Sequence, residues 1–75
     1  MPQIYNLILT RYENLEMTLR HSREIDDTYA LFHYHYEKSI KFQEQEVPEA
    51  GVFTWIFTYS ENPLSFEVLT FSKKP

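Results

Sequence analysis

The chain contains no cysteine and only one glycine, Gly51, in 75 residues. Without thiols it can form neither disulfides nor thiolate metal sites, and one glycine cannot make a glycine-rich phosphate loop. No apolar run approaches the roughly 18 residues of a membrane-spanning helix. The segment Met1-Pro2-Gln3 does not begin a basic and then apolar leader. We therefore expect a soluble, cytoplasmic protein, inside a bacterium or a host cell.

Basic residues are also missing from a long part of the chain. Residues 43–72 include no lysine, arginine or histidine, and the whole chain has a formal net charge of -4. An acidic surface repels the phosphates of nucleic acids and attracts basic proteins. We therefore expect no nucleic-acid binding. We expect Glu44, Glu46 and Glu49 to contribute to a surface that binds a basic protein partner.

The length indicates a single domain over residues 1–75. A chain this short buries only about 60% of the surface that its unfolded form exposes, so its stability depends on a rich core or on oligomerisation. Aromatic residues make up 17% of the sequence. Because each aromatic side chain can bury roughly 150 to 250 Å², they can supply such a core.

Turn residues separate segments in which apolar and polar residues alternate, which is typical of antiparallel strands. Five segments are expected to be loops: Glu13-Asn14, Asp26-Asp27, Glu37–Ser39, Pro48–Gly51 and Glu61-Asn62. Together they predict an all-β fold in which six antiparallel strands follow one another as a meander. An apolar face without a covering helix must be buried, so the meander is expected to curl into a small barrel or half-barrel.

The loops also predict how the strands pair. Tyr12 is expected opposite Leu15, Phe42 opposite Phe57, and Phe57 opposite Phe66. A shift of one residue in any pairing would turn the following strand over. The side chains predicted to point inward are those of Ile8, Tyr12, Leu15, Met17, Leu19, Phe32, Tyr34, Tyr36, Ile40, Phe42, Phe53, Trp55, Phe57, Tyr59, Leu64, Phe66 and Val68.

An α+β fold, with one central helix between two hairpins, is the alternative. Asp26 and Asp27 could cap such a helix, and Tyr29, Phe32 and Tyr36 would share a stripe with Ile40. The alternation of apolar and polar residues from Phe32 to Phe42, and the many aromatics there, favour strands instead.

Four apolar residues fall on the opposite face of the predicted first and last strands: Leu7, Leu9, Leu69 and Phe71. If the barrel closes, these strands meet and the four side chains become neighbours. We then expect them to form a contact between copies of the chain, as in a homodimer, with ordinary half-exposed positions on edge strands as the alternative.

His33 and His35 are weak candidates for a metal site. On a strand both imidazoles would project from one face, about 6.5 to 7 Å apart. The predicted pairing places Arg20 and Lys41 beside them, and these cations would oppose a divalent ion. We therefore expect neither a metal nor another cofactor.

No pattern of catalytic residues is present, so we expect the protein not to be an enzyme. The composition instead predicts a small acidic protein-interaction module, of the kind that a phage or mobile element encodes as an inhibitor or adaptor. The alternative is a β-barrel that binds a small apolar ligand. Its expected lining is Tyr12, Tyr34, Tyr36, Trp55 and Tyr59.

Overall fold

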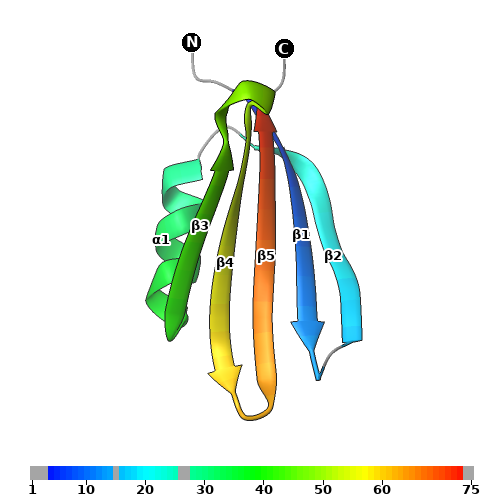
Figure 1. The fold of residues 1–75 in the computed structure, drawn as a ribbon, viewed down its shortest axis with the longest axis vertical. Coiled ribbons are helices and arrows are strands. Elements are labelled where there is room, and N and C mark those ends of the chain that lie inside the picture. The colour runs from blue at the N-terminus through cyan, green and yellow to red at the C-terminus, as the bar shows by residue number, and fades with distance from the viewer. Residues whose placement is uncertain (1–3, 15, 26–27, 74–75) are drawn as a thin grey trace.

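The computed structural model describes residues 4–14, 16–25 and 28–73 as one antiparallel sheet with a helix packed on it (Figure 1). Along the chain, the first hairpin precedes the helix and three further strands follow it. The elements are β1 (Tyr5–Glu13), β2 (Glu16–Ile25), α1 (Thr28–Lys38), β3 (Lys41–Val47), the 3-10 turn η1 (Pro48–Ala50), β4 (Val52–Glu61) and β5 (Leu64–Lys73).

The five strands lie in the order β2-β1-β5-β4-β3, and every neighbouring pair is antiparallel. The first and last strands therefore meet inside the sheet, while β2 and β3 form its two edges. The described strands leave the sheet open, so the predicted six-stranded barrel is wrong. The prediction of a mostly antiparallel β fold is confirmed, and the single helix agrees with the alternative.

Residues predicted to form the third strand form α1 instead. Its partly or fully buried side chains are those of Thr28, Leu31, Phe32 and His35, which follow the three- and four-residue spacing of a helix. Phe32 packs its ring 5.1 Å from the rings of both Phe42 and Trp55. The aromatic stripe that was predicted for such a helix is displaced by about one position, because Tyr29 and Tyr36 are exposed.

The helix ends where the chain joins the sheet. The Ser39 amide still donates to the His35 carbonyl, and the Ile40 amide donates to Thr58 on β4. The proposed N-terminal caps Asp26 and Asp27 lie outside the described residues. Among those described, no helix is long and apolar enough to cross a membrane.

The hairpin of β3 and β4 has the predicted register. Val47 lies opposite Val52 and Phe42 opposite Phe57. Gly51 has φ = 64°, the left-handed conformation that favours glycine, and its amide donates to the Pro48 carbonyl. The turn residues of Pro48–Gly51 together with the apolar pattern therefore predicted this register correctly.

The last hairpin has a different register from the predicted one. Glu61 lies opposite Leu64, so the turn falls one residue later than the predicted Glu61-Asn62. An irregularity between Thr58 and Ser60 then shifts the pairing by one residue and places Phe57 opposite Glu67. The shift turns β5 over. Its buried positions are Ser65, Glu67, Leu69 and Phe71, and Phe66 and Val68 point to the other side.

The first hairpin keeps the predicted faces although its partners differ. Tyr12 lies opposite Met17, and Thr10 opposite Leu19. These residues share a face as expected, but it is not the face that α1 covers. The predicted partner of Tyr12, Leu15, lies outside the described residues.

The core lies between α1 and one face of the sheet. Its fully buried apolar side chains are those of Leu7, Phe57, Leu69 and Phe71. Seven residues that were predicted to point inward are instead exposed: Ile8, Met17, Leu19, Tyr34, Tyr36, Ile40 and Leu64.

Candidate functional site

One face of the sheet carries no covering element among the described residues. Helix α1 packs on the opposite face, where Phe32 meets Trp55 and His35 meets Tyr59, and it lies behind β3 in Figure 1. We call the exposed side the uncovered face. On β2, β1, β5 and β4 it comprises Ile8, Thr10, Tyr12, Met17, Leu19, Thr54, Ile56, Thr58, Phe66, Val68 and Thr70, and on the edge strand β3 it continues through Lys41, Gln43, Gln45 and Val47.

These residues form continuous rows across neighbouring strands. Tyr12 lies between Met17 on β2 and Phe66 on β5. Its ring is stacked on that of Phe66, with centroids 4.7 Å apart. In the next row Val68 lies between Thr10 and Ile56. The apolar side chains are therefore contiguous rather than scattered.

The uncovered face combines exposure with little charge. The exposed fraction is 67% for Met17, 63% for Leu19 and 47% for Ile8. Among the residues named for the face, only the phenol of Tyr12 and the ammonium of Lys41 are ionisable, and Lys41 lies on the edge strand. A contiguous apolar patch on a soluble domain is typical of a surface that binds another molecule.

One edge of the sheet is acidic. Glu44 and Glu46 lie on the edge strand β3 opposite Trp55 and Phe53, on the side of the sheet where α1 packs, Glu49 follows in η1, and all three are exposed. Because β3 is an edge strand, one side of its backbone is available to a further strand, and charged side chains are a common protection of such edges.

A group of buried polar side chains connects α1 to the sheet. His35 and Glu67 are 8% and 5% exposed. The Nδ1 atom of His35 shares a hydrogen bond of 2.7 Å with the Tyr59 hydroxyl and lies 3.7 Å from Oε2 of Glu67. Residues from α1, β4 and β5 thereby meet at one point. The sequence offered no signal for this group, because β5 has apolar residues at both parities and Glu67 was predicted to face outward.

A cleft of about 280 Å³ opens beside this group. Arg11, Tyr34 and Lys38 complete its lining, and Arg11 is the cross-strand neighbour of Glu67. Lys38 Nζ donates to the Tyr34 hydroxyl at 2.6 Å. Since the polar groups contact one another, the arrangement connects helix and sheet, and the residues that line the cleft include no serine, threonine or cysteine.

The two histidines of the weak metal prediction lie on α1 and not on a strand. Positions two residues apart on a helix point to different sides. His35 is buried, whereas His33 is exposed and packs its ring 4.3 Å from that of Tyr29. Within residues 4–14, 16–25 and 28–73, no three histidine or acidic side chains are grouped to hold a metal.

The five aromatics predicted to line a ligand site do not share one cavity. Tyr12 lies on the uncovered face, and Trp55 belongs to the core packing under α1. Tyr34 and Tyr59 line the cleft beside His35. Tyr36 lines a different pocket. A barrel interior that could enclose a ligand is not formed by the described strands.

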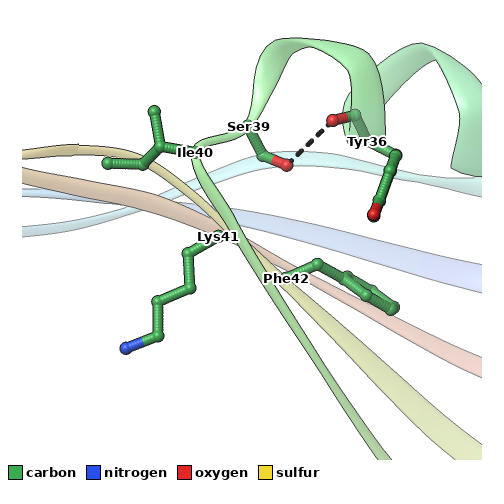
Figure 2. Close-up of a pocket in the computed structure, with 5 residues that line it drawn as sticks. All are labelled: Tyr36, Ser39, Ile40, Lys41 and Phe42. Carbon is green, nitrogen blue, oxygen red and sulfur yellow. Dashed lines mark hydrogen bonds between the residues drawn. The ribbon is translucent and has the colours of Figure 1, made fainter.

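That other pocket, of about 260 Å³, lies where α1 joins β3 (Figure 2). The rings of Tyr36 and Phe42 lie on one side of it, and Ile40 and Lys41 point to the other. The Ser39 hydroxyl donates to the Tyr36 carbonyl at 3.0 Å, so it completes the helix end.

The apolar residues predicted to contact a second copy lie in the core. Leu7 faces Phe71 and Leu9 faces Leu69 across β1 and β5, so the four are neighbours, although within an open sheet. Leu7, Leu69 and Phe71 are at most 1% exposed, and Leu9 is partly buried. They are therefore not available to a partner.

No family model, curated protein or solved structure matches this chain.

Proposed function

We propose that this protein is a small interaction module that binds a protein partner through its uncovered face. The observation that supports the proposal is the contiguous apolar surface on β2, β1, β5 and β4, with Met17 and Leu19 about two-thirds exposed. Burying such a surface against a partner is favourable by roughly 25 cal/mol per Å². The module needs no catalytic group for this role.

The acidic edge gives the binding surface a charge preference. Glu44, Glu46 and Glu49 are exposed at the β3 end of the sheet, and residues 43–72 contain no basic side chain to neutralise them. A partner with basic side chains around its contact surface would be attracted and oriented. This preference is the same as that predicted from the composition.

Two neighbouring positions on β2 allow a matched test. Leu19 belongs to the uncovered face, whereas Thr18 lies opposite Arg11 on the other face, and both side chains are exposed. Immobilised wild type, Leu19→Glu and Thr18→Glu proteins are compared in affinity capture from the native cell, with the captured proteins identified and their stoichiometry measured.

We expect wild type and Thr18→Glu to retain the same stoichiometric partner and Leu19→Glu to lose it. A Glu44→Gln/Glu46→Gln variant should weaken retention and reduce its sensitivity to salt. Equal capture by Leu19→Glu and Thr18→Glu would contradict the proposal, since both carry the same added charge.

A further inference from the structure

We infer that the occupant of the uncovered face is a second copy of this chain, packed face to face as a two-sheet sandwich with one α1 on each outer side. The inference rests on the proposed function, because it uses the same face and names its partner. It places the contact on the face opposite to Leu7, Leu9, Leu69 and Phe71.

The central strands have the pattern of strands that are covered on both sides. In β5, buried Leu69 and Phe71 alternate with the partly exposed Phe66 and Val68. In β4, Ile56 lies between Trp55 and Phe57, so three apolar residues follow one another. Such continuous apolar runs are consistent with the core of a sandwich. The helix covers one side only, and a second sheet would cover the other.

The size of the face suits a dimer. Five strands of seven to ten residues, at about 3.3 Å per residue and about 4.8 Å apart, give roughly 700 Å² for each copy. Stable interfaces bury roughly 600 to 1,000 Å² from each partner. Two identical sheets also share the same twist, so they can pack at the angle of about 30° that sandwiches adopt.

Charge does not oppose the self-contact although each copy carries a net charge of -4. The residues named for the uncovered face include no carboxylate, and their one cation, Lys41, lies on the edge strand β3. Glu44 and Glu46 are on the same strand but on the opposite side of the sheet. With the twofold axis parallel to the strands, β3 of one copy lies across from β2 of the other. The two acidic edges are then kept apart, and they stay at the rim of the dimer.

The proposed contact would also increase the stability of the folded chain. Its described residues include only four fully buried apolar side chains, and a domain of this length is marginally stable by itself. A second sheet would bury Met17, Leu19 and Ile8. The threonines of the face would add their methyl groups to the contact and could pair their hydroxyls across strands.

Sedimentation velocity over a wide concentration range tests the inference with the matched variants. We expect wild type and Thr18→Glu to be dimers at tens of micromolar. Leu19→Glu should dissociate at least about 100-fold more readily, because each copy would bury an unpaired carboxylate. Circular dichroism verifies the secondary structure of each variant. The fluorescence of Trp55, which lies on the opposite face, verifies its core packing.

Cysteine labelling locates the contact, since the chain has no cysteine of its own. The rate of maleimide reaction with Ile8→Cys should fall as the protein concentration rises, and that with Thr18→Cys should not. An unchanged rate at Ile8→Cys in a dimer would show association through another surface and would overturn the inference.

The outcomes separate the inference from the proposed function. A wild type that stays monomeric at several hundred micromolar, but captures another protein through Leu19, overturns the inference and leaves the proposed function intact. A monomer that captures nothing through this face overturns both. A dimer that Leu19→Glu does not weaken also overturns the inference.

Discussion

At the scale of single residues, the buried contacts of His35 account for the position of the helix. Its imidazole joins α1 to Tyr59 on β4 and lies beside Glu67 on β5. A buried polar group is costly unless it is hydrogen-bonded. The sequence alone did not distinguish His33 from His35. The helix does, because it leaves the ring of His33 exposed and buries that of His35.

The Tyr59→Phe variant tests this account. It removes the hydroxyl that shares a 2.7 Å hydrogen bond with His35, so the free energy of unfolding should fall by about 1 kcal/mol. Chemical denaturation measures the change. Tyr34→Phe is the control, because its hydroxyl contacts Lys38 on the exposed side of the helix and should contribute little. Equal losses in both variants would contradict a special role for the buried contact.

At the scale of elements, the register of each strand decides which apolar residues become core. The Pro48–Gly51 hairpin has the register that its turn residues predict. In the last hairpin, the irregularity between Thr58 and Ser60 turns β5 over. Since strands β4 and β5 are apolar on both faces, the pattern of hydrophobicity alone could not distinguish the two registers.

Neighbouring residues on β1 give a direct test of the observed face. Leu7 is 1% exposed and Ile8 47%. Leu7→Ala should lower the free energy of unfolding by about 2 to 5 kcal/mol, as is usual for a fully buried leucine. Ile8→Ala should cost much less when measured at low protein concentration. Denaturant titrations of both variants measure these losses. A larger loss for Ile8→Ala than for Leu7→Ala would support the face predicted from the sequence.

At the scale of the whole molecule, the sheet has two apolar faces and one helix. From the edge strand β2 the chain passes through α1 to the other edge strand, β3. The helix covers only one face of the sheet. The residues expected inside a barrel, such as Met17 and Leu19, therefore remain exposed, whereas Leu7 and Phe71 are buried. The requirement to cover an apolar face led to the barrel prediction. In the open sheet, the same requirement supports the proposed contact with a partner.

Concentration-dependent stability follows from the proposed sandwich. A contact made only by the folded state raises the melting temperature as the concentration rises. We expect the wild type to melt a few degrees higher for each tenfold increase in concentration. Leu19→Glu should melt at a temperature independent of concentration. Differential scanning calorimetry at several concentrations measures both, and a constant melting temperature for the wild type would count against self-association.

The sequence by itself was enough to predict an antiparallel, aromatic-rich sheet, the Pro48–Gly51 hairpin and the exposure of Glu44, Glu46 and Glu49, because turn chemistry and charge act locally. It could not decide whether residues 28–38 are helical, since their aromatics suit either structure. Tertiary structure decided this choice, because Phe32 covers Trp55 and Phe57 only from a helix. It also decided which apolar face is buried, because that depends on where the helix packs.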